Sequence, residues 1–369
     1  MNIRPCFVEI NLNAITNNYN VIKELSKKDI IGVVKANAYG HGAIEVSRNL
    51  INNGVIMLAV ATVEESLELR SVFTEIPILI LGPVPDFQKK DCITNNISFI
   101  ASTIHEIEFI SSVAKSVNKN ALIHIALDTG MSRVGYFAHS PSESSVEDIA
   151  NMIDTEFINV EGIFTHFASA DESDLSFTYK QYSAFEYIVS QLQSRGFEFK
   201  YIHCQNSAAS MVLPNDICNC VRAGISLYGY YPSSDIQVNA TLLPALSWKC
   251  RISHIKDVPA GTPIGYGSTY VTDSNCKIAT LPVGYADGLR RSLSNSFEVI
   301  CNNGLAPVVG RICMDQCMID VSEIDCEIGD EVYLINNTQT AEKMAMIDDT
   351  ISYEILCGIS LRVPRVYTK

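Results

Sequence analysis

Residues 30–42 read IIGVVKANAYGHG, an apolar run that ends in a lysine and is followed by a loop of small residues with two glycines. The run Ile30–Lys35 predicts a buried strand, because short apolar runs bounded by turn residues are typical of parallel sheets. Lys35 therefore stands at the carboxyl end of a strand. A lysine at such a place either extends its ammonium group into solvent or forms a Schiff base with an aldehyde.

Seven further strand-like runs follow up to about residue 230, and amphipathic stretches such as Val63–Ser71 and Thr178–Ser194 alternate with them. Eight alternations favour a closed (β/α)8 barrel of the TIM type over an open sheet, and we expect it to span residues 1–235. The eight expected strands are Ile30–Lys35, Met57–Ala61, Ile78–Leu81, Ser98–Ala101, Leu122–Leu127, Val160–Thr165, Lys200–His203 and Val221–Ala223.

After about residue 235, helical periodicity nearly disappears until Met344–Leu356. We therefore expect an α/β barrel followed by a mostly-β domain over residues 236–369. The first ten residues predict an isolated strand that can join either part. The β-type runs of the second domain are Trp248–Lys256, Lys277–Pro282, Phe297–Cys301, Pro307–Val309, Cys317–Val321 and Glu331–Ile335.

The charge balance argues against nucleic-acid and membrane partners. The chain has 27 Lys and Arg against 41 Asp and Glu, a formal net charge of −14, and no basic cluster that would bind phosphate backbones. Its apolar runs, such as Ile76–Val84, are short and interrupted by proline and glycine, whereas a membrane-spanning helix needs about 20 apolar residues. With no apolar signal segment in the opening residues, we expect a cytoplasmic protein.

The twelve cysteines predict no metal site. Most lie in apolar runs, where a thiol packs as a small hydrophobic group. The close pairs Cys218/Cys220 and Cys313/Cys317 have one-residue and three-residue spacers, which differ from the paired C-x2-C spacing of zinc sites. We therefore expect reduced, structural thiols.

Polar residues follow several of the expected strands and would meet at one rim of the barrel, the face where such folds place their active sites. Each of them alone also has an ordinary structural explanation, such as packing or a turn. The segments are DTGMSRVG at 128–135, THF at 165–167, HCQNS at 203–207 and VRAGI at 221–225. The Gly224–Ile225 step could present backbone N–H groups to a phosphate.

Together these motifs resemble the alanine racemase family, which uses pyridoxal 5'-phosphate (PLP). The resemblance rests on VVKANAYGHG, DTGMSRVG, RAGISLYG, GYGSTY and GRICMDQCMIDV, occurs in both expected domains, and covers about Val8 to Tyr367. It implies a homodimer in which each active site lies between one barrel and the partner's β domain. It also implies interconversion of L- and D-alanine, which in a bacterium supplies peptidoglycan precursors.

The resemblance also implies a role for each matching residue. Lys35 resembles the Schiff-base lysine and one acid–base group, and Tyr266 resembles the second acid–base group. The phosphate would be held by Tyr39, Ser207, Gly224, Ile225 and Tyr353. His166 would lie beside the pyridine ring, and Arg222 would face its nitrogen. The substrate carboxylate would contact Arg133 and the backbone of Met314, and Tyr285 would line the entrance.

The chemistry explains these residue types. Racemisation removes a proton from one face of Cα and delivers one to the opposite face. A single base tends to return the proton to the same face, so two groups on opposite faces are the economical solution. Arg222 cannot accept a proton, so a ring nitrogen facing it should stay neutral. We expect this neutral ring to withdraw electrons more weakly and to suppress transamination.

One position departs from the family. Many members carry a carbamylated lysine two residues before the aspartate of DTGM, and here that position is Ala126. No carbamate can form there, so we hypothesise that chloride, another anion, or water with another side chain lies near Ala126 and Arg133.

Alternative functions remain open. A serine or broader small-amino-acid racemase differs by one hydroxyl group of the substrate. A PLP decarboxylase fits less well, because it does not need the Lys35/Tyr266 pair. A non-catalytic PLP-binding protein would need no second proton donor.

Overall fold

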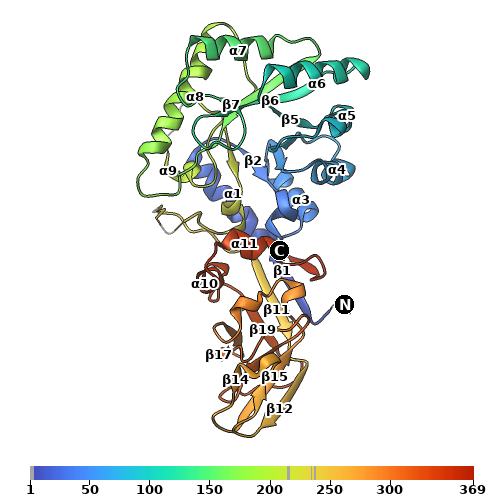
Figure 1. Cartoon of the computed structure of the whole chain (residues 1–369), viewed down its shortest axis with the longest axis vertical. Coiled ribbons are helices and arrows are strands. Elements are labelled where there is room, and N and C mark those ends of the chain that lie inside the picture. Colours follow the sequence, from blue (N-terminus) through green and yellow to red (C-terminus); the bar gives the residue numbers. More distant parts are fainter. Residues whose placement is uncertain (1–3, 214–216, 234, 237) are drawn as a thin grey trace. The chain divides into compact units, whose positions relative to one another are not determined.

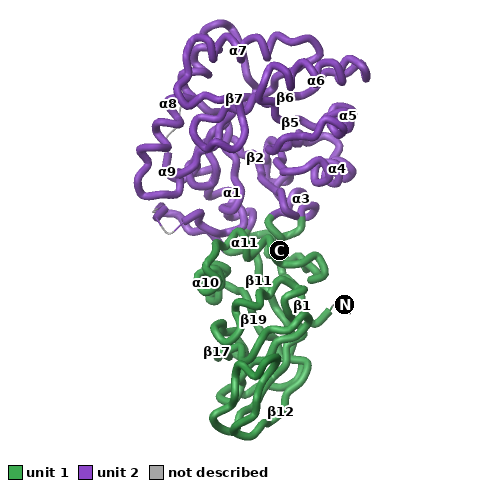
Figure 2. The backbone as a smooth tube through the Cα atoms, in the orientation of Figure 1, with its two compact units in different colours: residues 1–14, 39–42, 244–369 green, residues 15–38, 43–243 purple. Residues whose placement is uncertain are grey.

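The computed structural model describes residues 4–213, 217–233, 235–236 and 238–369. Its backbone divides into two compact units, which Figure 2 distinguishes by colour. We call residues 15–38 and 43–243 the barrel unit, and residues 1–14, 39–42 and 244–369 the β unit.

The barrel unit confirms the predicted (β/α)8 architecture (Figure 1). Its eight principal strands pair in parallel in the order β10-β2-β3-β4-β5-β6-β8-β9. Hydrogen bonds from Asn219 N to Ile202 O (3.1 Å) and from Arg222 N to Gln205 O (2.9 Å) link β9 to β10 and nearly close the barrel. The strands are β2 (Asp29–Val33), β3 (Met57–Val60), β4 (Ile78–Ile80), β5 (Ser98–Ala101), β6 (Ala121–Asp128), β8 (Ile158–Thr165), β9 (Tyr201–His203) and β10 (Cys220–Ala223). A short strand β7 (Tyr136–Phe137) pairs with β6.

Burial on both faces explains why these strands read as continuous apolar runs rather than alternating ones. Every residue of β3, β4, β5 and β10 is buried. The connecting helices are α1 (Leu12–Ser26), α3 (Ala43–Asn53), α4 (Val63–Val72), α5 (Asp86–Thr94), α6 (Ile104–Ser116), α7 (Glu143–Ile153), α8 (Ser176–Ser194) and α9 (Ala209–Val212), with a 3-10 turn η1 at Ile225–Tyr228. The segment α2 (Lys35–Tyr39) has left-handed backbone angles and is described with the site.

The β unit is built around a six-stranded sheet in the order β17-β16-β19-β11-β1-β20. The N-terminal strand β1 (Cys6–Asn11) pairs antiparallel with β11 and parallel with β20. The other strands of this sheet are β11 (Leu246–Arg251), β16 (Glu298–Cys301), β17 (Gly304–Pro307), β19 (Glu331–Ile335) and β20 (Arg365–Thr368). Two smaller sheets contain β12 (His254–Val258), β15 (Cys276–Leu281) and β18 (Cys317–Asp320), and β13 (Pro263–Ile264) with β14 (Tyr270–Val271).

Several elements of the β unit differ from the sequence expectation. The strand expected at Pro307–Val309 lies three residues earlier, as β17 (Gly304–Pro307), and the sequence did not predict β13, β14 or β20. The run Trp248–Lys256 is two strands, because the chain leaves the six-stranded sheet after β11 and enters the three-stranded sheet as β12. The helical run Met344–Leu356 is two helices, α10 (Ala341–Ile347) and α11 (Ser352–Cys357). Asp349 lies between them with φ of 52°, which ends a right-handed helix. The unit's remaining 3-10 turns are η2 (Tyr266–Ser268), η3 (Tyr285–Asp287) and η4 (Arg291–Leu293).

None of the helices among the described residues is both long and apolar enough to cross a membrane. Within the same residues, no group of three or more His, Cys, Asp or Glu side chains is placed to hold a metal ion.

Candidate active site

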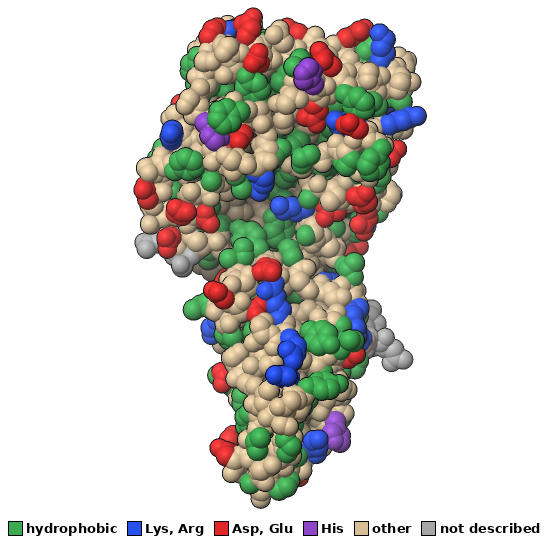
Figure 3. Space-filling view, in the orientation of Figure 1, with side chains coloured by type: hydrophobic (Ala, Val, Ile, Leu, Met, Phe, Trp, Pro, Cys, Tyr) green, Lys and Arg blue, Asp and Glu red, His purple; other side chains and the backbone are tan. Residues whose placement is uncertain are grey.

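The barrel unit contains a cavity of about 250 Å³. Four residues singled out by the sequence line it, namely Lys35 after β2, Arg133 after β6, His166 after β8 and Arg222 in β10. Figure 3 shows the barrel unit hollowed on one face, with Lys and Arg side chains in the hollow. Parallel strands all present their carboxyl ends at the same mouth, so residues from distant parts of the sequence meet there.

The backbone after Lys35 makes a left-handed turn, where the sequence predicted only a loop. Residues 36–38 have φ between 51° and 53°, a conformation that costs non-glycine residues roughly 1–2 kcal/mol each. Three hydrogen bonds support the turn, from Ala38 N to Val34 O (2.8 Å), from Ala36 N to Glu65 Oε1 (2.6 Å) and from Ala43 N to Asn37 Oδ1 (2.8 Å). Strain that the surroundings enforce is typical of functional sites.

Glu65 is a supporting residue that the sequence analysis missed. Its Oε2 accepts hydrogen bonds from Ala61 N (2.8 Å) and Thr62 N (3.2 Å), and Thr62 caps the start of α4. The pattern Thr62-x-x-Glu65 is the sequence signature of such a capping box. The signal was therefore present, but it did not indicate that the other carboxylate oxygen holds the turn beside Lys35.

Arg222 is buried, and the protein occupies both of its terminal nitrogens. Nη1 donates to His203 Nδ1 (2.8 Å) and to His203 O (2.9 Å). Nη2 donates to Thr165 O (2.9 Å), Cys204 O (3.1 Å) and His166 Nδ1 (3.1 Å). The remaining donor, Nε, makes no hydrogen bond with any residue in the described ranges. Because Arg222 lines the cavity, this N–H is available to a ligand.

The histidines around Arg222 are neutral. Burial and the charge of Arg222 lower the pKa of His166 and of His203 well below 6.5. The same two causes lower the pKa of His124, which contacts His203, to about 3. Burial lowers the pKa of Arg222 to about 10, so Arg222 keeps its charge near neutral pH. The site therefore combines one buried cation with neutral imidazoles, which favours an electron-rich or anionic ligand.

Three residues predicted to hold a phosphate lie together after β9 and β10. Ser207 is buried, and its Oγ accepts hydrogen bonds from Gly224 N (2.9 Å) and Ser226 Oγ (3.0 Å). Ile225 begins the η1 turn, whose first N–H groups have no partner within the turn itself. Ser207, Gly224 and Ile225 thus form one polar corner of the barrel unit.

The other predicted site residues belong to the β unit. The ring centroids of Tyr39 and Tyr353 lie 5.9 Å apart at 56°. Tyr266 is 70% exposed, between Gly265 and Gly267, which have φ of 71° and 72°. Tyr266 is therefore an exposed side chain of the β unit, whereas Arg222 of the barrel unit is buried.

Tyr285 and Met314 are neighbours in the β unit. Tyr285 N donates to Cys313 O and Ala286 N donates to Met314 O, both at 3.0 Å. A Cβ at Gly284 would lie 2.3 Å from Cys313 O, so this close approach requires glycine. The side chains of Tyr285 and Met314 remain 43% and 53% exposed.

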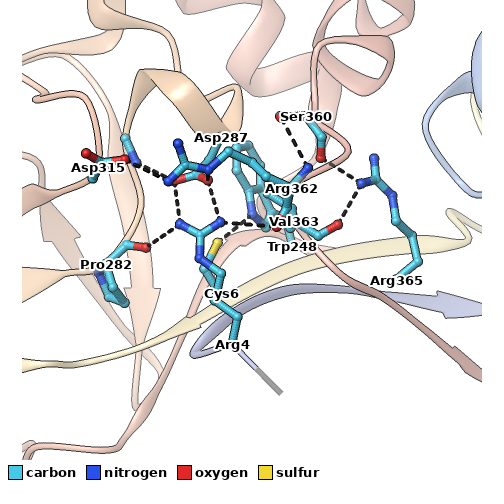
Figure 4. Close-up of polar contacts among 11 residues, drawn as sticks. Arg4, Cys6, Trp248, Pro282, Asp287, Asp315, Ser360, Arg362, Val363 and Arg365 are labelled. Atoms are coloured by element: carbon cyan, nitrogen blue, oxygen red, sulfur yellow. Dashed lines mark hydrogen bonds and ion pairs between the residues drawn. The ribbon is translucent and has the colours of Figure 1, made fainter. Parts of the chain in front are cut away.

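The turn at Tyr285 ends in a buried carboxylate, Asp287, which contacts two arginines (Figure 4). Asp287 is fully buried and accepts hydrogen bonds from Arg4 Nη1 (2.5 Å) and Nη2 (2.9 Å), and Arg362 Nε lies 3.1 Å away. Its Oδ2 also accepts from Gly284 N (3.1 Å). Taken locally, YADG at 285–288 has the pattern of an ordinary turn, which does not indicate this cluster.

Comparisons with known proteins place these residues in a family. Models described as the N-terminal and C-terminal domains of alanine racemase match residues 10–232 and 245–367. Alanine racemase 2 of Caldanaerobacter subterraneus subsp. tengcongensis is 44% identical, with 99% of this chain and 95% of that protein covered. The alanine racemase structure from Clostridium difficile 630 is 43% identical with a TM-score of 0.94, covering 99% and 96%.

A more distant structure agrees. The structure titled as alanine racemase from Bartonella henselae with covalently bound pyridoxal phosphate is 29% identical with a TM-score of 0.87, covering 98% of this chain and 99% of that one. Both family domains occur in order over nearly the whole sequence. The chain therefore belongs to the alanine racemase family.

Proposed function

We propose that this chain interconverts L-alanine and D-alanine, with PLP as its cofactor. The convergence of Lys35 and buried Arg222 on one cavity at the carboxyl ends of the barrel strands carries the proposal. An amine in that place suits an aldehyde-bearing cofactor, and family membership indicates which one. In a bacterium the reaction would supply D-alanine for peptidoglycan, and we propose a cytoplasmic location.

The residues present fit PLP. Lys35 offers an amine for the aldehyde, and Arg222 Nε offers an N–H to the ring nitrogen. His166 would lie beside the ring, where Arg222 already fixes its Nδ1 as an acceptor. The phosphate would be held by Tyr39, Ser207, Gly224, Ile225 and Tyr353. When bound, PLP withdraws electrons from the amino-acid Cα and so acidifies its proton.

Lys35 and Tyr266 would move the proton. A single base tends to return a proton to the face from which it came, whereas two groups on opposite faces invert the centre. Lys35 would act on one face from within the barrel, and Tyr266 of the partner subunit would act on the other. Met314 and Tyr285 of the partner subunit would contact the substrate and line the entrance.

The exposure of the β-unit residues supports a shared site in a homodimer. Tyr266, Met314 and Tyr285 are large side chains that a single chain leaves 43–70% exposed. Exposed aromatic and apolar groups of this size mark contact surfaces, and two-fold symmetric dimers are the commonest oligomers. The amino-acid substrate would then be enclosed by residues of both protomers.

Arg222 also bears on reaction specificity. Its guanidinium donates to every acceptor it meets and cannot take a proton, so a ring nitrogen beside it stays neutral. We expect weaker electron withdrawal and few side reactions. Arg222→Glu should therefore raise transamination of alanine to pyruvate, measured as keto acid released per racemisation event. An unchanged ratio would remove this role from Arg222.

Arg133 would bind the substrate carboxylate. It lines the cavity and makes no ion pair with any residue of the described ranges. Ala126, at the position of the family's modified lysine, packs with Ile100 and Phe164 in an apolar cluster and supplies no negative charge. We propose that an anion such as chloride balances Arg133. Replacing chloride by a bulky, weakly bound anion at constant ionic strength should raise the KM for alanine about twofold to fivefold; rates insensitive to halide would exclude the anion.

The decisive test of activity is proton exchange. The PLP-loaded protein is incubated with L-alanine and, separately, with D-alanine in D2O. Both solutions should lose optical rotation while Cα gains deuterium. A spectral change on binding without loss of rotation would instead indicate a non-catalytic PLP-binding protein. Measuring kcat/KM for both enantiomers of alanine and serine then tests a serine racemase, because an apolar pocket rejects one extra hydroxyl by only about 10².

A further inference from the structure

His124 is a buried polar residue that the proposed chemistry does not use. It lies on β6 inside the barrel and is fully buried, and its ring stacks on Tyr201 with centroids 5.5 Å apart and an interplanar angle of 16°. His124 Nδ1 lies 2.9 Å from His203 Nε2, and His203 Nδ1 lies 2.8 Å from Arg222 Nη1. The three side chains form one hydrogen-bonded row, which we call the His124–His203–Arg222 row.

Only one arrangement of protons satisfies this row. Arg222 has donors and no acceptor, so His203 Nδ1 must accept. A neutral His203 then carries its proton on Nε2 and donates it to His124. His124 Nδ1 must therefore accept, and its own proton resides on Nε2. The fixed polarity of Arg222 thus determines the tautomers of both histidines.

In this row, one nitrogen of His124 is left without a hydrogen bond. His124 Nε2 is buried and has no hydrogen-bond partner within the described residues. Burying an unpaired N–H is unfavourable, and an apolar side chain in the same place would avoid the cost. The hydrogen bond that His124 Nδ1 accepts from His203 Nε2 therefore explains why a histidine is kept at this buried position.

The backbone opposite His124 is also adapted to it. Gly162 pairs with His124 across β6 and β8, next to a register shift in the ladder. A Cβ at Gly162 would lie 2.5 Å from His124 Nδ1 and 2.6 Å from its Cε1. The φ angle of Gly162 is not positive, so its backbone conformation does not require glycine. Glycine is required because a Cβ would occupy the space of the His124 ring.

We propose that His124 is a positioning residue for Arg222, acting through His203. By accepting the Nε2 proton of His203, it keeps the Nδ1 lone pair directed at Arg222 Nη1. Phe164, stacked on His203 with centroids 5.0 Å apart and 5.3 Å from the Arg222 guanidinium carbon, holds both groups from one side. The row therefore fixes the orientation in which Arg222 Nε remains for the cavity. This inference rests on the proposed role of Arg222 toward the cofactor.

The tautomers can be observed directly by 15N NMR of the PLP-loaded protein labelled in its seven histidines. The resonances of His124 and His203 are assigned by single substitutions. Between pH 6 and 8, both rings should show an unprotonated Nδ1 and a protonated Nε2. An Nδ1–H form or a doubly protonated ring at either position would overturn the proposal.

Two substitutions at the same site separate the hydrogen bond from packing. His124→Asn can place an amide oxygen where Nδ1 lies, whereas His124→Leu fills the space without an acceptor. We expect His124→Leu to alter the His203 nitrogen shifts and to lower kcat about tenfold or more, with the KM for alanine changed less than about twofold. His124→Asn should restore the His203 tautomer and most of kcat. Tyr201→Phe keeps the stacked ring and serves as the matched control with unchanged kcat.

A His124→Leu protein with native His203 shifts and unchanged kcat would contradict the proposal. If His124→Leu fails to fold, the 15N NMR tautomers of the wild-type protein and the kcat of His124→Asn still test the proposal. The NMR readout requires no turnover, so it separates the two levels of inference. A protein with the expected tautomers that does not racemise alanine would reject the proposed function alone, and a racemase with other tautomers would reject only the role of His124.

Discussion

The two units present their candidate site residues in opposite ways. In the barrel unit, Arg222 is 3% exposed and its terminal nitrogens are saturated by five acceptors supplied by the protein. In the β unit, Tyr266 is 70% exposed and Met314 is 53% exposed. Hydrogen bonds within the barrel unit hold Arg222 in one orientation, whereas Tyr266 and Met314 of the β unit are exposed on its surface.

This difference indicates a division of labour. Preorganised donors in a buried site are suited to binding a cofactor and stabilising charge. Exposed aromatic and apolar groups are suited to contacting a second surface, which in the proposed homodimer is that of the partner subunit. Substitutions in the barrel unit should therefore change the charge and protonation of its cavity, and substitutions in the β unit should, in the proposed homodimer, change the groups that reach the partner's site.

The largest effect is expected at Tyr266. Tyr266→Phe removes the proposed proton donor on one face of Cα and should lower the racemisation rate by about 10² to 10⁴. Deuterium exchange from D2O should persist for one enantiomer only, because Lys35 still serves one face. Tyr270→Phe, which changes a tyrosine packed in the same unit, is the control. Equal loss of exchange for both enantiomers would contradict a two-face mechanism.

The next effect concerns the stability that the buried ion pairs of Asp287 give to the β unit. Asp287→Asn leaves Arg4 and Arg362 without the buried carboxylate between them and should lower the free energy of unfolding by about 2–4 kcal/mol. Asp315→Asn removes an exposed partner of Arg362 and should cost less than about 1 kcal/mol. Urea unfolding measures both. Similar losses for the two variants would show that burial of Asp287 contributes nothing.

The effect that is smallest near neutral pH concerns the pH dependence of stability, and it separates the barrel from the β unit. The pKa of His124 falls from 6.5 to about 3 on folding, so below pH 6.5 the unfolded chain binds a proton that the folded chain does not. Stability should fall between pH 6.5 and 3 by up to about 1.4 kcal/mol per pH unit for this histidine. His124→Leu should make the slope shallower by that amount. His254→Gln, at an exposed site of the β unit, should leave it unchanged; identical slopes for all three proteins would be the contrary result.

The sequence predicted the barrel well because its signal is local. All eight barrel strands occur at the expected runs, for example Ser98–Ala101 without a change of bounds. The left-handed turn at 36–38 could not be predicted, because alanine and asparagine carry no requirement for positive φ. Contacts between residues far apart in the sequence could not be predicted either. Arg4 and Asp287, for example, are 283 positions apart, and no local pattern connects them. His124 sits in an apolar strand, where its pattern is that of an ordinary core residue.

The most direct test of the central claim mixes two inactive proteins. Lys35→Ala lacks the barrel amine and Tyr266→Phe lacks the phenol of the β unit. If each site combines Lys35 of one protomer with Tyr266 of the partner subunit, unfolding and refolding the two variants together produces mixed dimers with one intact site. Random pairing should then restore about a quarter of wild-type activity. Activity no higher than that of the separate variants would contradict a site shared between two chains.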